Sequence, residues 1–118
     1  MKTVKTLLML TMLGVFTISA NSCAECKNES PRAKITNNGT ATASVQIKTS
    51  GGNTVNINNV DPGTSSAYSG YAAGITTFTI SVSNLDYVEV VVMSDCYEYD
   101  IAIDANNTIT TTATDRND

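Results

Sequence analysis

The chain has 118 residues, with seven basic and eleven acidic residues, no histidine and no tryptophan. Its formal net charge of −4 disfavours nucleic acid and anionic lipid headgroups as partners, because like charges repel. The absence of histidine excludes Ser-His-Asp and Cys-His catalysis and removes the most common zinc ligand. The composition therefore favours a binding function over a catalytic one.

Residues 1–20 have the pattern of a secretory signal peptide. Two lysines precede an apolar run over residues 7–18, and the small residues Ser19 and Ala20 follow it. The run is shorter than the roughly 20 apolar residues that a membrane-spanning helix needs. We therefore expect export, with cleavage after residue 20, or after residue 22 in the case of a lipoprotein.

A polar tether over residues 21–31 is expected to precede a domain in which apolar and polar side chains alternate. The segment RAKITNNGTATASVQIK, residues 32–48, has two alternating runs on either side of Asn38-Gly39. Asn-Gly between such runs is a strong signal for a β-hairpin, because a type I′ turn needs positive φ at both central residues. The sequence predicts two paired strands here.

Turn residues separate the next strands. SGGN at 50–53 and DPGT at 61–64 predict tight turns, the second with Pro and Gly in the order of a type II turn. A piece rich in Ser, Tyr and Gly follows, and we interpret it as a short, irregular edge strand.

The second half of the chain continues the same pattern. ITTFTISVS at 75–83 alternates, whereas YVEVVVM at 87–93 is more continuously apolar, so we expect the latter to be a central strand with Glu89 at its wetter end. Residues 97–103 alternate again, and Asn106-Asn107 predicts the last turn.

The whole pattern is that of a small all-β domain. Short strands recur every 8–12 residues, and no window after the leader has a helical period. We predict an antiparallel immunoglobulin-like β-sandwich of seven to eight short strands over residues 32–114, with a small β-barrel as the alternative. Residues 115–118 are expected to form a disordered C-terminal tail.

The three cysteines allow several chemistries. Cys23 and Cys26 form a CxxC motif, but redox catalysis needs a helix context that this polar segment lacks, and three cysteines without histidine fall short of a zinc site. Two interpretations remain. Either Cys23 carries a lipid and Cys26 pairs with Cys96, or ordinary cleavage leaves Cys96 bonded to one member of the CxxC pair.

The residues before Cys23 resemble a bacterial lipoprotein signal, with the small residue Ser22 directly before the cysteine. As a whole, the leader, the early cysteine, the polar tether and the strand pattern resemble small uncharacterised exported β-sandwich lipoproteins of Bacteroidetes-type bacteria. The resemblance implies lipidation of Cys23 and a place at the outer membrane or cell surface. A periplasmic or secreted protein is the alternative.

Two groups of residues are candidates for binding. Glu98 and Asp100 share one strand face, and Glu89 is expected to lie across from them. The three carboxylates would then supply oxygen ligands suited to Ca²⁺. The alternative is that they form a solvated outer face with no bound ion. Tyr68 and Tyr71, in a flexible segment, are candidates for contact with a sugar or peptide, because tyrosine combines an apolar ring with a polar tip; packing is the alternative.

Together these observations predict a non-enzymatic, exported module of the cell envelope, or a secreted one, that serves interaction or adhesion. The expected partner is a protein or a glycan, with contact to the membrane only through a lipid on Cys23. We expect no catalytic residue and no cofactor. A calcium-binding or calcium-stabilised domain is the alternative function, and a hydrolase is the third.

Overall fold

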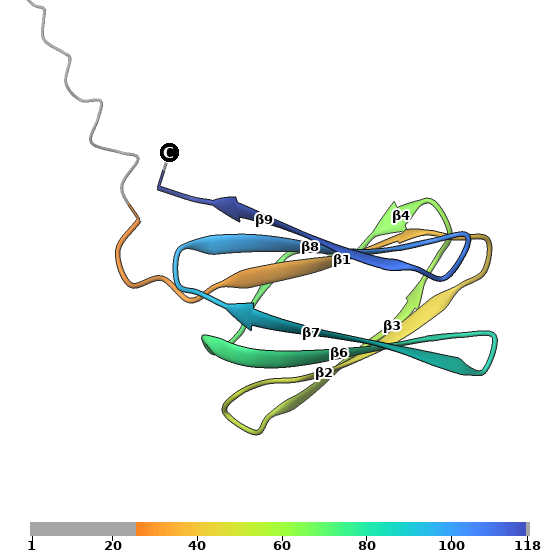
Figure 1. Cartoon of the computed structure of the whole chain (residues 1–118), viewed down its shortest axis with the longest axis horizontal. Helices are drawn as coiled ribbons and strands as arrows, with labels where there is room; N and C mark the ends of the chain where they lie inside the picture. Colours follow the sequence, from red (N-terminus) through yellow and green to blue (C-terminus); the bar gives the residue numbers. More distant parts are fainter. Residues whose placement is uncertain (1–25, 118) are drawn as a thin grey trace, which may run out of the picture.

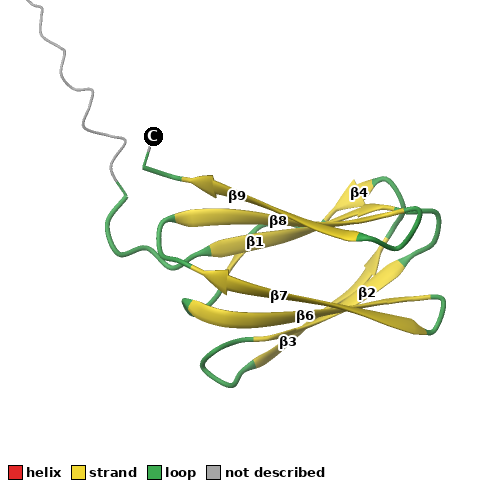
Figure 2. Ribbon diagram, viewed as in Figure 1, coloured by secondary structure: helices red, strands yellow, loops and turns green. Residues whose placement is uncertain are grey.

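The computed structural model describes residues 26–117, so the expected signal peptide and the expected lipidation site Cys23 lie outside the described residues. Nine strands and their turns make up the described part, and it contains no helix that could span a membrane (Figures 1 and 2). The strands are β1 (Arg32–Asn38), β2 (Ala43–Lys48), β3 (Thr54–Val60), β4 (Thr64–Ser65), β5 (Ser69–Gly70), β6 (Gly74–Val82), β7 (Leu85–Met93), β8 (Tyr97–Asp104) and β9 (Ile109–Asp115).

The strands form two sheets that face each other. Sheet A has the order β4-β1-β8-β9, with β5 also paired to β1, and sheet B has the order β3-β2-β6-β7. The predicted β-sandwich is therefore confirmed, and the barrel alternative does not apply, because the two sheets are not joined into one closed sheet. The count of nine exceeds the expected seven to eight because β4 and β5 are two-residue strands along β1.

Alternation of side chains places the core between the sheets. In sheet B, Ile47 of β2 lies opposite Phe78 of β6, and in sheet A, Ile35 of β1 lies opposite Ile101 of the parallel strand β8. All four side chains are fully buried. Removal of this apolar surface from water is the main force that holds the sheets together.

The prediction of a hairpin at Asn38-Gly39 is wrong. β1 belongs to sheet A and β2 to sheet B, so residues 39–42 cross from one sheet to the other. The reason lies in Asn37, whose buried carboxamide donates hydrogen bonds to the carbonyl oxygens of Ala41 and Val60 and accepts one from Gly39 N. This side chain fixes the crossing and leaves neither Asn38 nor Gly39 with positive φ.

The prediction that residues 87–93 form a central strand is also wrong. β7 is an edge strand of sheet B, paired only with β6. Its residues Val88, Val90 and Val92 point away from the core and are 58–68 % exposed. The predicted tight turns at 50–53 and 61–64 are present, with positive φ at Gly52 and Gly63.

Candidate functional site

The sandwich has two ends that differ in character. At the first, here called the tether end, residues 26–31 approach the domain and the chain leaves β9. At the second, here called the far end, lie the turns 39–42, 83–84 and 105–108 (Figure 1). Every long strand runs from one end to the other, so whatever is attached at the tether end is separated from the far end by the length of the domain.

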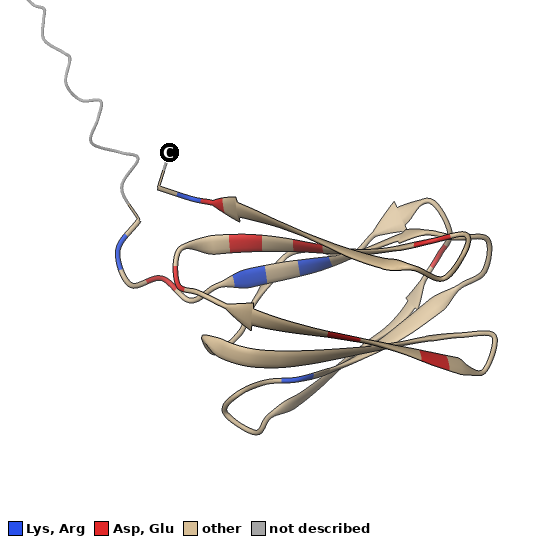
Figure 3. Cartoon of the chain, in the orientation of Figure 1, with Lys and Arg blue, Asp and Glu red and all other residues tan. Residues whose placement is uncertain are grey.

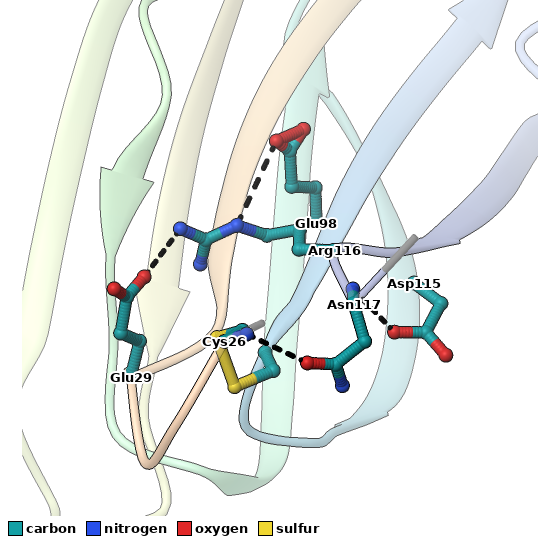
Figure 4. Close-up of a disulfide and its surroundings, with 7 residues drawn as sticks. Cys26, Glu29, Glu98, Asp115, Arg116 and Asn117 are labelled. Atoms are coloured by element: carbon teal, nitrogen blue, oxygen red, sulfur yellow. Dashed lines mark hydrogen bonds and ion pairs between the residues drawn. A yellow bond between two sulfur atoms is a disulfide. The ribbon is translucent and has the colours of Figure 1, made fainter. Parts of the chain in front are cut away.

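A disulfide fixes the tether end. Cys26 is bonded to Cys96, with a Cα–Cα distance of 5.7 Å, which confirms the pairing expected from the cysteine count (Figure 4). Backbone hydrogen bonds extend the attachment, because Cys96 N donates to Glu29 O and Tyr71 N donates to Pro31 O. The last part of the predicted tether is therefore bound to the domain.

The end of the chain is held at the same place. Arg116 N donates to Cys96 O, and Cys26 N donates to the Asn117 side-chain oxygen at 2.8 Å. β9 itself extends to Asp115. Residues 115–117 thus take part in hydrogen bonds at the tether end.

Charged residues lie near this attachment point on several segments of the chain (Figure 3), and Figure 4 shows the side chains of Glu29, Glu98 and Arg116 beside the disulfide. Arg116 contacts Glu29 at 2.5 Å and lies 3.9 Å from Glu98, which also accepts a 2.6 Å hydrogen bond from Arg32. The hydrogen bond to Glu98 raises the pKa of Arg32. Because these pairs are partly exposed, each stabilises the fold only modestly.

At the far end, the outer face of sheet B contains a polar hollow with a volume of about 540 Å3. Neighbouring strands supply a row of polar residues, since Ser44 of β2 lies opposite Ser81 of β6, and Ser81 lies opposite Asp86 of β7. Residues from β3 and from the turns complete the lining, which consists of Thr42, Ser44, Asn59, Ser81, Ser83, Asn84 and Asp86.

Local backbone geometry positions three of these side chains. Ser83 and Asn84 form the two-residue turn between β6 and β7 and both have positive φ, as a type I′ turn requires. Opposite Ser44, β3 contains one extra residue, and Asn59 within this β-bulge has a φ of 62°. A bulge redirects a side chain relative to a regular strand, which brings Asn59 to the hollow.

Two hydrogen bonds order the hollow from within. The Ser81 hydroxyl donates to Asp86 Oδ1 at 2.5 Å, and Thr42 Oγ1 donates to Asp61 Oδ1 at 3.3 Å. Among residues 26–117, the side chains of Ser44, Asn59 and Asn84 have no hydrogen-bond partner, so their donors and acceptors face solvent. The hollow can therefore exchange hydrogen bonds with a polar ligand.

No protein-family model, curated protein or solved structure matches this chain.

The structure does not bring together the three carboxylates expected to form a calcium site. Glu98 and Asp100 do share the outer face of β8, but Glu98 is paired with Arg32 and Asp100 accepts a hydrogen bond from Thr36. Glu89 lies in the other sheet and accepts a hydrogen bond from Thr111 at 2.7 Å. Within the described residues, no group of three or more Asp, Glu, Cys or His side chains could hold a metal ion.

The two tyrosines proposed for ligand contact lie in different environments. Tyr71 is 7 % exposed and belongs to the core, so its side chain is not available to a ligand. Tyr68 is 39 % exposed, and its ring lies 5.3 Å from the Arg32 guanidinium and 5.2 Å from the Lys34 ammonium. Of the two tyrosines, only Tyr68 lies at the surface, where a ligand could contact it.

Proposed function

We propose that the chain is an exported, non-enzymatic interaction module of the cell envelope that binds its partner at the far end of the sandwich. The observation that supports this function most directly is the separation of the attachment point from the polar hollow. Cys26 is bound at the tether end, whereas the hollow lies beside the turn between β6 and β7 at the far end.

The dimensions fit such a role. β6 and β7 each have nine residues, which at about 3.4 Å per residue span roughly 30 Å between the two ends. Only two residues separate Cys23 from Cys26 in the sequence. A lipid on Cys23 would therefore hold the tether end close to a membrane, and the far end would project away from it.

The chemistry of the far end supports binding rather than catalysis. One carboxylate, that of Asp86, lines the hollow together with hydroxyl and carboxamide groups, and Asp61 lies next to the lining through its hydrogen bond with Thr42. Glycoside hydrolysis commonly uses two carboxyl groups on either side of the scissile bond, and only one carboxyl group lines the hollow. We propose a protein or glycan partner, no nucleic acid, and contact with the membrane only through the lipid.

An orientation experiment tests this function. Cells that produce the full chain would be compared with cells whose chain contains a small folded domain inserted at Ala105, in the far-end turn between β8 and β9. The matched control has the same insertion at Gly51, in the turn between β2 and β3 at the tether end. Both turns are exposed, and exposed turns tolerate insertions.

We expect all three proteins at the cell surface, with an intact mass that includes a lipid on Cys23. Adhesion of the cells to immobilised proteins and polysaccharides should be lost with the insertion at Ala105 and kept with the insertion at Gly51. Retention of the chain in the cytoplasm, or equal adhesion by both insertion variants, would contradict the proposed function.

A further inference from the structure

The lining of the polar hollow selects a chemical class of ligand. Four hydroxyls, two carboxamides and one carboxylate line it, and it has neither an aromatic nor a basic side chain. A phosphate, sulfate or carboxylate ligand would find no cation there and would meet the negative charge of Asp86. An apolar ligand would gain little, because no apolar side chain lines the hollow.

Hydrogen-bonding capacity points to a neutral ligand with several hydroxyl groups. A carboxylate only accepts hydrogen bonds, whereas a carboxamide and a hydroxyl both donate and accept. Adjacent hydroxyls on a sugar ring offer the same combination of donors and acceptors. Asp86 accepts the Ser81 hydrogen bond on Oδ1, which leaves its other oxygen for a ligand hydroxyl.

The positions of these groups are fixed before a ligand arrives. Ser44, Ser81 and Asp86 are held in one row by the pairing of β2, β6 and β7. The bulge and the type I′ turn fix the backbone of Asn59 and Asn84, so only the side-chain rotamer has to be ordered when either carboxamide forms a hydrogen bond to a ligand.

We propose that the polar hollow is a binding site for a neutral saccharide. The proposal rests on the proposed function, since it names the ligand class of the far end. The site has no aromatic ring on which a sugar ring could stack. The affinity for a single sugar unit therefore depends on hydrogen bonds alone. We therefore expect dissociation constants in the millimolar range for monosaccharides and tighter binding for oligosaccharides.

The test is a titration of residues 21–118, produced without a lipid, followed by amide chemical shifts. The probes are glucose, mannose, galactose and N-acetylglucosamine, each with its trisaccharide, and sodium phosphate and ammonium chloride serve as ionic comparisons. At least one saccharide should produce saturable shifts confined to the amides of Asn59, Ser83, Asn84 and their neighbours.

Two substitutions examine the lining without altering the backbone. Asp86→Asn keeps the shape and removes the charge and part of the accepting capacity, and Asn84→Gly removes a carboxamide at a positive φ that glycine accepts. Each should weaken saccharide binding about tenfold, as expected for loss of one hydrogen bond to a charged or polar partner. Asn28→Gly, at a positive-φ asparagine of the tether end, is the matched control and should leave binding unchanged.

The outcomes separate the two proposals. Absence of any saccharide-dependent shift, shifts outside the hollow, or a response only to phosphate or ammonium would overturn the saccharide site. If adhesion still depends on the far end in that case, the proposed function stands with another ligand. If far-end insertion leaves adhesion unchanged, the proposed function fails whether or not a saccharide enters the hollow.

Discussion

Removal of the disulfide should destabilise the domain by an amount that can be worked out from its position. Cys26 and Cys96 are 70 residues apart, so their bond closes a long loop in the unfolded chain and lowers its entropy, worth on the order of 4 kcal/mol in the loop-closure treatment. A domain of this size has a total stability of roughly 5–15 kcal/mol. The disulfide should therefore account for a large part of the stability.

The comparison uses C23A and C23A/C26A versions of residues 21–118, which carry no lipid. In C23A the bond between Cys26 and Cys96 is retained and no third thiol can exchange with it. In C23A/C26A the bond cannot form, and we expect the free energy of unfolding to fall by about 4 kcal/mol. The melting temperature should fall by roughly 15–30 °C for a domain of this length.

Urea denaturation followed by circular dichroism measures this difference, and intact mass confirms the bond in C23A. Treatment of C23A with a reductant provides a second measurement and should reproduce the unfolding midpoint of C23A/C26A. A loss below about 1 kcal/mol would refute the loop-closure argument for this domain. It would mean that the hydrogen bonds of Glu29, Arg116 and Asn117 hold the tether end without the covalent bond.

Three further predictions concern the core and the carboxylates. Burial raises the pKa of Tyr71, so the contribution of this residue to stability is retained below the ordinary tyrosine pKa of about 10 and declines as the pH rises above it. Tyr71→Phe should remove that decline in alkaline urea titrations. The same substitution should cost less than about 1 kcal/mol at neutral pH, because the buried Tyr71 hydroxyl has no hydrogen-bond partner among the described residues. Asn37→Ala should destabilise by about 2–4 kcal/mol in urea denaturation, since it leaves the carbonyls of Ala41 and Val60 and the amide of Gly39 without their partner. Millimolar Ca²⁺ should leave the melting temperature unchanged, and a rise of several degrees would show that a cation site forms despite the separation of the three carboxylates.

The sequence was sufficient for the strands, and it limited the disulfide to Cys96 with Cys26 or Cys23, but it was not sufficient for the assignment of strands to sheets. Alternation reports which side chains share a face of one strand, and this is a local property. The partner of a strand is decided by distant residues: β1 pairs in parallel with β8, which begins nearly 60 residues after β1 ends. At Asn38-Gly39, the local sequence favours a hairpin, but the buried hydrogen bonds of Asn37 stabilise a crossing from one sheet to the other instead.

The polar hollow could not be predicted for a related reason. Its residues are serine, threonine, asparagine and one aspartate, which are also the ordinary residues of turns and of solvent-exposed strand faces. Only the pairing of Ser44 with Ser81 and of Ser81 with Asp86 brings them together, and only the bulge adds Asn59. Neither register nor a bulge can be read from a single sequence in which so many positions are polar.

The edge position of β7, by contrast, had a signal in the sequence. Tyr87, Val91 and Met93 face the core, and Glu89 has the same phase as these residues. A carboxylate on the inner face of a central strand would be buried without water, at a large cost in free energy. At an edge it stays half-buried and reaches a partner across the sandwich, here the Thr111 hydroxyl of β9. An inward-facing charge also discourages pairing of the edge with another chain, so Glu89 was better evidence of an edge strand than the valines were of a central one.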